Sequence, residues 1–408
     1  MDIEIEDEEI QNKKIEFNFP MLTIRTQIFT GIFNKLGTFR FSKIASWIAV
    51  SFVPIIAGIG LYMVFNSLFA VLSTPAVGEI TRELGPAAYL LLPGINPFLP
   101  IFSGWLAIVV AIAIHEGAHG VAARSLGFRV KSSGLLFLFI IPIGAFVDVD
   151  EKQIEKANPK SSIRVMAAGV GGNIVVAVVC LIGILVIVNG LTPIIDGVYI
   201  SNVQEGMPAE LAGILPDDVF VSIDNIPINN YEDLLTILED KTPGDIIDVI
   251  VVRGEMWKEQ FATSIELTEF EDRAIMGVNL GDLLAEERLT FYQTVTPETL
   301  SVYLVPPSLA SGIIPFSDTL SPFYSHGLGD QWSLIANVLF WLWFVNVNLA
   351  VFNALPIYPL DGGRIFNITL KGIMGHKWDK KIISQITTAV TITLVSVIVL
   401  LAITPFII

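Results

Sequence analysis

Five long apolar runs separated by charged segments set the pattern of this chain. They occupy residues 44–78, 85–114, 165–195, 331–360 and 382–408 and contain no charged side chain. Each is longer than the roughly 18 residues that a helix needs to cross a bilayer. The pattern predicts a polytopic α-helical membrane protein of about five to six transmembrane helices, placed near 44–73, 102–126, 165–190, 331–355 and 382–406.

Three other apolar segments are not expected to cross the membrane as helices. Residues 133–147 are too few to span it and are rich in strand-forming side chains, so we expect a small membrane-dipping β-hairpin there. Prolines interrupt residues 85–100, which favours an extended or re-entrant segment. Prolines also break residues 299–317, which we do not count as a span.

Residues 196–286 are charged and rich in turns. Alternating apolar positions predict strands at Val198–Val203, Val219–Ile223 and Ile246–Arg253, and a helical spacing predicts a helix at Tyr231–Leu238. We therefore expect an α+β domain inserted between the third and fourth spans. The chain then divides into an acidic N-terminal tail with an interfacial segment (1–43), a first membrane part (44–195), the inserted domain (196–286) and a second membrane part (287–408).

Composition excludes several classes of protein. Of 408 residues, 53% are hydrophobic and 16% are charged, against about 25% charged residues in ordinary soluble proteins. The net charge of −16 disfavours nucleic acid as a partner, because phosphate neutralisation requires a basic face. The single cysteine, Cys180, permits no intrachain disulfide and no thiolate zinc cluster.

The 24 lysines and arginines predict the orientation in the membrane. Most of them lie in residues 1–43, 124–164 and 364–381, which the positive-inside rule places in the cytoplasm. We therefore expect a multi-pass protein of the cell membrane with a cytoplasmic N-terminus and residues 196–286 on the outer side. The acidic start of the chain indicates no cleaved signal. Residues 21–43 mix basic and apolar side chains and fit a segment lying along the inner membrane surface.

Candidate chemistry begins in the second span, with the sequence His115-Glu116-Gly117-Ala118-His119. Positions i and i+4 of a helix share one face, so both imidazoles can reach one metal ion while Glu116 lies beside it as a general base. A charge at membrane depth costs about 2.5–3.5 kcal/mol on insertion scales, so three ionisable groups within five residues indicate that they bind something. The alternative interpretation is a hydrogen-bonded polar cluster at the membrane boundary.

Zinc catalysis requires a third protein ligand and an open coordination position. The fourth span ends in the sequence Asn353-Ala-Leu-Pro-Ile-Tyr-Pro-Leu-Asp361-Gly-Gly. Its prolines end the helix and its glycines allow close backbone approach, so Asp361 can turn back toward His119 from the same side of the membrane. A plain turn aspartate is the competing interpretation. The histidine motif at matching depth favours the ligand.

The third span contains the sequence Ala167-Ala-Gly169-Val-Gly-Gly-Asn173. Its small residues favour close packing between helices. The Asn173 amide lies in an apolar run and has two candidate roles. It donates to an oxyanion or to a substrate backbone, or it forms an interhelical hydrogen bond.

These motifs together resemble the site-2 proteases, which are zinc intramembrane metalloproteases. The resemblance covers most of residues 100–408. It implies that His115, His119 and Asp361 hold one Zn²⁺ ion and that Glu116 is the catalytic base. It also makes Asn173 and Asn353 candidates for polar contacts with the substrate or transition state. The hairpin near 133–147 looks like the element of this family that presents the substrate as an extended strand.

The inserted domain resembles a PDZ domain in four segments: Gly197–Val203, Pro208–Ile214, Asp218–Asp224 and Pro243–Asp245. PDZ domains bind peptide C-termini or extended segments by strand addition. The edge for such binding is expected at Ala274–Gly281. The alternative is a domain that acts only as a steric cap, because a fold does not establish a function.

Together these features predict a zinc-dependent endopeptidase that hydrolyses peptide bonds within or near transmembrane segments, as in regulated intramembrane proteolysis. The expected partners are transmembrane protein or peptide substrates and the lipid bilayer. Zinc would lower the pKa of its water toward about 7, and Glu116 would take the proton. One alternative is a membrane metal-ion transporter, whose path would spread polar positions over several spans. Another is a non-catalytic scaffold, which would have lost a ligand or the base.

Overall fold

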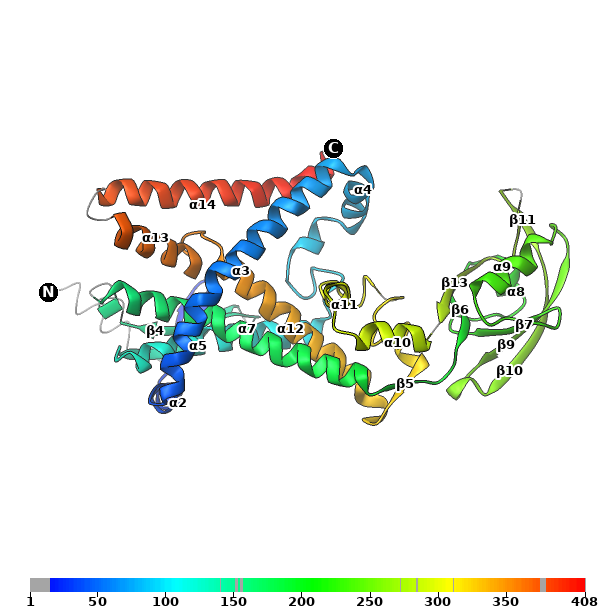
Figure 1. Cartoon of the computed structure of the whole chain (residues 1–408), viewed down its shortest axis with the longest axis horizontal. Helices are drawn as coiled ribbons and strands as arrows, with labels where there is room; N and C mark the ends of the chain where they lie inside the picture. Colours follow the sequence, from blue (N-terminus) through cyan, green and yellow to red (C-terminus); the bar gives the residue numbers. More distant parts are fainter. Residues whose placement is uncertain are drawn as a thin grey trace. The chain divides into compact units, whose positions relative to one another are not determined.

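The computed structural model describes residues 15–139, 141–150, 153–154, 157–271, 273–283, 285–310, 312–374 and 379–407. The acidic stretch 1–14 of the expected tail lies outside these residues. The chain separates into two compact units, Met1–Leu181 with Phe340–Ile408, and Ile182–Leu339. Figure 1 labels many of the helices and strands of both units.

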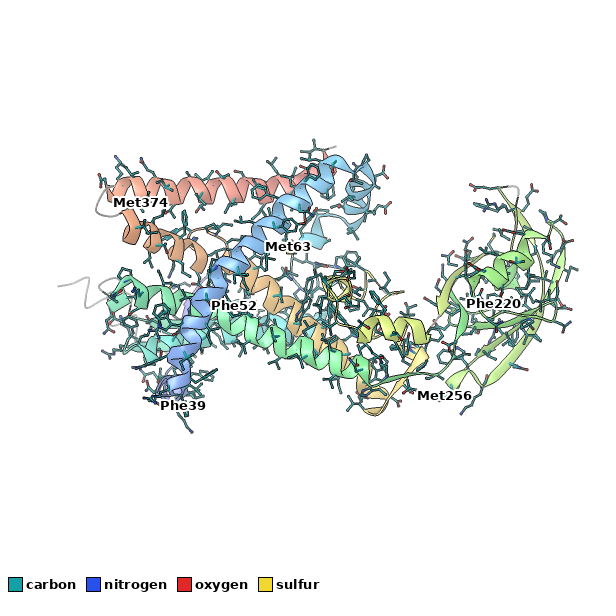
Figure 2. The ribbon with its side chains drawn as sticks, viewed as in Figure 1. Phe39, Phe52, Met63, Phe220, Met256 and Met374 are labelled. Atoms are coloured by element: carbon teal, nitrogen blue, oxygen red, sulfur yellow. The ribbon has the colours of Figure 1, made fainter. Side chains whose placement is uncertain are left out.

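Among the described residues, five helices are long and apolar enough to cross a membrane. They are α3 (Arg40–Ser73), α5 (Ile101–Ser125), α7 (Pro159–Asn189), α12 (Trp332–Ala354) and α14 (Lys380–Ile403). Their surfaces carry exposed apolar side chains such as Phe52 and Met63 on α3 (Figure 2). A helix that is apolar on every face suits a lipid environment. The chain is therefore a multi-pass membrane protein, and the predicted spans are confirmed.

The first unit is held together by small side chains where its long helices meet. A buried cluster joins α3, α7 and α12 through Ala49, Val53, Ile56, Ala167, Val170, Ala350 and Ala354. Small residues let helix backbones approach closely in a membrane. The unit also contains α4 (Pro75–Leu84), the short helices η1 (Pro86–Tyr89) and η5 (Thr404–Phe406), and α13 (Asp361–Met374), which contacts α14.

A four-stranded antiparallel sheet completes the first unit. Its order is β1 (Ile15–Asn18), β2 (Met21–Thr26), β3 (Val130–Leu138) and β4 (Ile141–Val149). Strands β3 and β4 confirm the hairpin that the sequence predicts near 133–147. Strand β4 packs against α5, so the sheet lies beside the helix that carries the histidine motif.

Residues 21–43 contain two elements that the sequence did not predict. Residues 21–26 form β2, which pairs with β3 from Met21 opposite Leu138 to Thr26 opposite Ser133. Helix α2 (Ile28–Gly37) then packs on α5, where the Phe33 ring covers Gly120. The strand partner lies more than a hundred residues away in the chain, so local patterning carries no sign of it. The position of residues 21–43 along the inner membrane surface stays a prediction.

The second unit contains the inserted domain, a six-stranded sheet with two helices. Its main strands are β6 (Gly197–Val203), β7 (Val219–Ile223), β9 (Ile246–Arg253), β10 (Glu259–Glu266) and β13 (Val278–Leu283). Their order is β10-β9-β7-β6-β13, and β8 (Ile226–Pro227) pairs with β7. Helices α8 (Pro208–Leu211) and α9 (Tyr231–Glu239) cover a core that includes Val198, Phe220, Leu234 and Ile247. The strands predicted at 198–203, 219–223 and 246–253 and the helix predicted at 231–238 are confirmed to within one residue. The edge strand expected at Ala274–Gly281 is confirmed only in part, because residues 273–275 pair in another sheet and β13 begins at Val278.

The rest of the second unit is made of short elements. Strand β5 (Leu191–Pro193) pairs with β14 (Tyr324–His326), and β11 (Thr268–Phe270) pairs with β12 (Arg273–Ile275). The others are α10 (Ala285–Gln293), α11 (Pro297–Val302), η2 (Glu255–Trp257), η3 (Ser321–Phe323) and η4 (Gly329–Gln331). Helix α11 ends before the prolines of 299–317, so the prediction that this segment is not a span is confirmed.

Candidate active site

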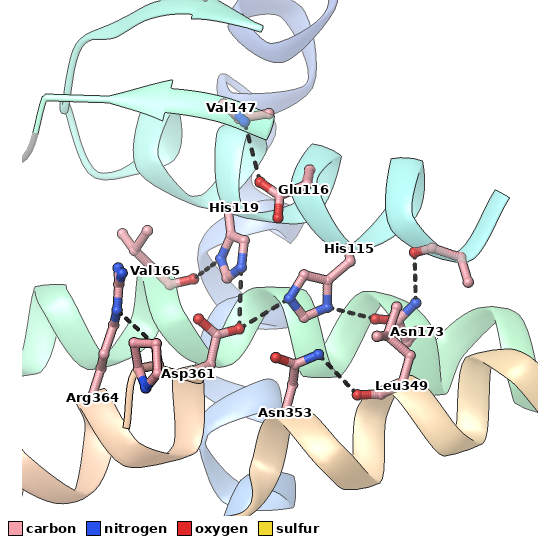
Figure 3. A network of polar contacts seen from close by, with 12 residues as sticks. His115, Glu116, His119, Val147, Val165, Asn173, Leu349, Asn353, Asp361 and Arg364 are labelled. Carbon is pink, nitrogen blue, oxygen red and sulfur yellow. Dashed lines mark hydrogen bonds and ion pairs between the residues drawn. The ribbon is translucent and has the colours of Figure 1, made fainter. Parts of the chain in front are cut away.

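Helix α5 places two histidines and a glutamate near its C-terminal end. His115 and His119 lie one turn apart on one face, with their ring centroids 4.9 Å apart. Glu116 is one residue further along the helix than His115 and so points about 100° away from it. Its Oε2 accepts a hydrogen bond of 3.1 Å from the backbone N–H of Val147 on β4 (Figure 3).

A tight turn brings Asp361 to the same place. Helix α12 ends at Ala354, two residues before Pro356, and α13 begins at Asp361, two residues after Pro359. A Cβ at position 362 would collide with the backbone of Ala354, so Gly362 is what lets α13 fold back onto the end of α12. The turn thereby places the Asp361 carboxylate at the start of α13, facing the two imidazoles (Figure 3).

The three side chains converge on one point. Asp361 Oδ2 lies 3.1 Å from His115 Nε2 and 3.2 Å from His119 Nε2. One donor atom from each residue lies within 4.8 Å of the other two. His115 and Asp361 are both buried, with exposed fractions of 7% and 9%. The structure thus joins two segments more than two hundred residues apart, in the grouping that the sequence predicts.

The other nitrogen of each ring is already engaged. His119 Nδ1 donates to the Val165 carbonyl oxygen at 2.7 Å, because a carbonyl oxygen can only accept. His115 Nδ1 lies 2.7 Å from Asn173 Oδ1, which also accepts. In the neutral state both rings therefore carry their proton on Nδ1, and both Nε2 atoms present a lone pair to Asp361.

The two Nε2 atoms and Asp361 Oδ2 are all hydrogen-bond acceptors when the rings are neutral, and no described donor lies among them. Asp361 Oδ2 is buried and receives no hydrogen bond from any described residue. Buried polar atoms are normally satisfied, so such an atom requires an explanation. Two imidazole lone pairs and a carboxylate are the donor set of a zinc site that keeps one position open. The residues therefore fit a bound divalent cation.

Gly169 on α7 borders the same point. A Cβ at this position would lie 2.6 Å from His119 Nε2 and 2.7 Å from His115 Nε2. Only glycine leaves this space open. Sequence reasoning assigned the glycines of this span to helix packing. That role fits Gly172, whose Cβ would meet the Ala118 side chain at 2.9 Å, but it does not describe what Gly169 faces.

Asn173 is fully buried and its amide is fully used. The Nδ2 group donates to the Ala111 carbonyl oxygen at 2.9 Å and to Asn346 Oδ1 at 2.8 Å, while Oδ1 accepts from His115. Both amide hydrogens are committed, so none remains for an oxyanion. The geometry favours the interhelical hydrogen bond, the second of the two roles considered for Asn173. Asn346 itself was missed, because an asparagine outside a motif gives no local signal.

A cavity of about 300 Å³ opens beside the three ligands. Asn353 lines it, and its amide donates to the Leu349 carbonyl oxygen at 3.0 Å. The remaining wall comes from α5 (Glu116), β4 (Val147 and Val149), the segment between β4 and α7 (Ile154), α7 (Val165 and Met166), the turn before α13 (Pro359 and Leu360) and α13 itself (Arg364). The cavity thus combines convergent polar groups with apolar side chains, as binding sites do.

Comparisons with known proteins identify a protein family and several relatives. The model of peptidase family M50 matches residues 103–398. Uncharacterized protein MJ0971 of Methanocaldococcus jannaschii is 25% identical over 352 residues, which cover 84% of this chain and 76% of that protein. Zinc metalloprotease RasP of Oceanobacillus iheyensis is 24% identical over 238 residues, which cover 54% of this chain and 53% of RasP. Among solved structures, the PDZ domain of an SdrC-like protein of Listeria monocytogenes is 20% identical and covers 23% of this chain and 94% of that domain, with a TM-score of 0.20.

Proposed function

The chain belongs to peptidase family M50, and on that premise we propose that it is a zinc-dependent endopeptidase that hydrolyses peptide bonds within or near transmembrane segments of membrane proteins. The observation that carries this proposal is the convergence of His115, His119 and Asp361 on one point beside Glu116. The name of RasP describes that relative as a zinc metalloprotease. Imidazole and carboxylate groups are also the ligands that a catalytic zinc ion takes.

The metal and the base have separate positions in the proposed mechanism. His115, His119 and Asp361 would hold the ion. When bound, zinc supplies Lewis acidity, which polarises a peptide carbonyl and makes a water molecule easier to deprotonate. Glu116 takes that proton as a general base and then donates it to the amine of the cleaved bond. The Val147 N–H keeps the Glu116 carboxylate in place throughout.

The substrate must reach this cavity in an extended form. A helix uses its carbonyl groups in its own hydrogen bonds, so a transmembrane substrate has to unwind locally before its peptide bond can react. Asn353 lines the cavity and is the candidate for a polar contact with the unwound segment. Substrates with helix-weakening residues near the cleaved bond should therefore be preferred.

The inserted domain suits a role in substrate selection. In its sheet β13 is an edge strand, and such an edge can pair with an extended peptide or a C-terminus. The basic segments favour a cytoplasmic N-terminus and an outer location for this domain in the cell membrane. There it would meet the short ectodomain left by an earlier cut, as in regulated intramembrane proteolysis. We propose the same four parts as the sequence analysis: the N-terminal tail and interfacial segment (1–43), the first membrane part (44–195), the inserted domain (196–286) and the second membrane part (287–408).

The test is Glu116→Gln in the full chain reconstituted in liposomes. The amide still accepts from Val147 but cannot take a proton, so cleavage of a transmembrane peptide should fall by about 10²- to 10⁴-fold. Zinc content, measured by metal analysis, should be unchanged. Glu79→Gln, which alters an exposed carboxylate on α4, is the matched control and should cleave normally. Unchanged cleavage by Glu116→Gln, or zinc flux without cleavage in the wild type, would overturn the proposal.

A further inference from the structure

Asn346 lies in the apolar helix α12 and is completely buried. Its Nδ2 donates to the Leu342 carbonyl oxygen at 2.7 Å. Asn348 and Asn353 on the same helix make the same bond to the carbonyl four residues earlier. Asn346 differs from these two because its Oδ1 also accepts a hydrogen bond from Asn173 on α7. A buried amide that crosses between helices is costly to place in a membrane unless it is fully bonded.

The direction of every hydrogen bond in this chain of amides is determined. Leu342 offers only a carbonyl oxygen, so Asn346 must present Nδ2 to it and Oδ1 to Asn173. Ala111 also offers only a carbonyl oxygen, so Asn173 must turn Nδ2 toward Ala111 and Asn346. The Asn173 Oδ1 that remains can only accept. His115 Nδ1 must therefore carry the proton.

The fixed proton determines what His115 offers to the ligand cluster. With Nδ1 protonated, the lone pair of the neutral ring is on Nε2, the atom 3.1 Å from Asp361 Oδ2. A reversed Asn173 amide would point an N–H group at Nδ1 and favour the opposite tautomer, which has a proton on Nε2 and no lone pair for a cation. Asn346 resists this reversal, because its Oδ1 needs a donor from Asn173.

We propose that Asn346 is a positioning residue of the metal centre, which acts through Asn173 to hold His115 in the tautomer whose Nε2 binds the cation. This inference rests on the proposed function, since it concerns the same three ligands. Helix α12 then contributes to the site in two ways: Asn346 in its middle orients His115, and the turn that follows the helix places Asp361. His119 needs no such relay, because the backbone carbonyl of Val165 fixes its proton directly.

The test compares two substitutions at one position in the full chain. Asn346→Leu is similar in size but has no polar atom. Asn346→Asp stays neutral at this depth, so its carbonyl oxygen accepts from Asn173 while its hydroxyl donates to Leu342. Partners of metal-bound histidines change metal affinity by about 10- to 100-fold. Zinc dissociation constants, measured by chelator competition, should rise by at least about 10-fold for Asn346→Leu and stay near the wild-type value for Asn346→Asp.

A second measurement uses the wild-type chain and does not depend on the folding of a variant. The chain has four histidines, so ¹⁵N-histidine labelling and solid-state NMR can resolve the tautomer of His115 in the metal-free protein. We expect protonated Nδ1 in the wild type and in Asn346→Asp. Unprotonated Nδ1 in the wild type would overturn the proposal, as would equal zinc affinity in Asn346→Leu and Asn346→Asp.

A control distinguishes the loss of the hydrogen bonds from Asn346 through Asn173 to His115 from the loss of a side-chain amide on any helix. Asn189 on α7 also donates to the carbonyl four residues earlier, and it is exposed. Asn189→Leu should leave zinc affinity unchanged. Neither affinity nor tautomer depends on peptide cleavage. A chain that binds zinc with this Asn346 dependence but cleaves no peptide would therefore end the proposed function and leave this inference standing.

Discussion

In the membrane unit Asp361 Oδ2 is buried without a hydrogen bond from any described residue, whereas in the inserted domain Oδ2 of the buried Asp218 accepts two hydrogen bonds. Asp218 Oδ2 accepts from the Leu215 N–H at 2.9 Å and from Arg253 Nη2 at 2.6 Å. The same Arg253 guanidinium lies 3.9 Å from the centre of the Phe261 ring. Asp361 Oδ2 therefore lacks a hydrogen-bond donor among the described residues, whereas Asp218 Oδ2 has two.

The difference shows how to distinguish a ligand site from a structural ion pair. A buried carboxylate that already pairs with a cationic side chain of the same domain contributes to one folded arrangement. A buried charge that faces only acceptors is unfavourable until a cation or protons arrive. The three predictions that follow test whether this distinction holds, and they run from the largest expected effect on zinc affinity to the smallest.

Asp361→Ala should have the largest effect, because it removes one of three ligands. We expect zinc affinity to fall by more than about 100-fold, beyond the effect of losing a partner of a ligand, and cleavage to be lost with it. Chelator competition and a peptide cleavage assay measure the two quantities. Asp330→Ala, at an exposed aspartate in η4, is the control. If Asp361→Ala bound zinc as tightly as the wild type, Asp361 would not be a zinc ligand, and the contrast between a ligand carboxylate and the structural carboxylate Asp218 would be contradicted.

Gly169→Ala should have an intermediate effect. The added methyl group would press against both Nε2 atoms, so the imidazoles have to shift, and we expect zinc affinity to fall by about 10- to 100-fold, as for other changes next to a ligand. Gly183→Ala on the same helix would meet only the flexible Leu339 side chain. If both variants bind zinc equally, Gly169 serves packing alone.

Arg253→Met should leave zinc affinity unchanged and affect only stability. Removing one partner of a buried ion pair strands the other charge and costs about 3 kcal/mol. The inserted domain should therefore unfold at lower temperature, which hydrogen exchange of its amides can follow in the full chain. Arg273→Met, at an exposed arginine of β12, should change stability by less than about 0.5 kcal/mol. A loss of zinc affinity in Arg253→Met would contradict the separation of roles.

Local sequence patterns predict features that depend on the residues of a single helix or strand. The spans, the hairpin and the strands of the inserted domain follow from runs and alternations of apolar residues, because burial imposes those periods. The histidine motif also lies within one helix, so its spacing alone predicts a shared face. Asp361 required one further step, from prolines and glycines that indicate a sharp turn.

Features that depend on distant contacts escaped the sequence. Strand β2 is identified by its pairing with β3, and Gly169 by the imidazoles that it faces. Asn346 and Asn173 form one hydrogen bond across 173 positions of the chain. No window of sequence contains both partners of such contacts, so their roles require the three-dimensional arrangement. The oxyanion role considered for Asn173 is disfavoured because both of its amide hydrogens donate to such distant partners, Ala111 and Asn346.

The sheet beside α5 has one more consequence. In the described part of the chain, β1 and β2 occupy one side of β3, so the outer edge of β4 is the edge next to Glu116. Val147 points its N–H outward there, and equivalent donors recur every second residue, about 6.6–6.8 Å apart. Under the proposed function, an extended substrate that paired with this edge would shift past Glu116 in steps of two residues.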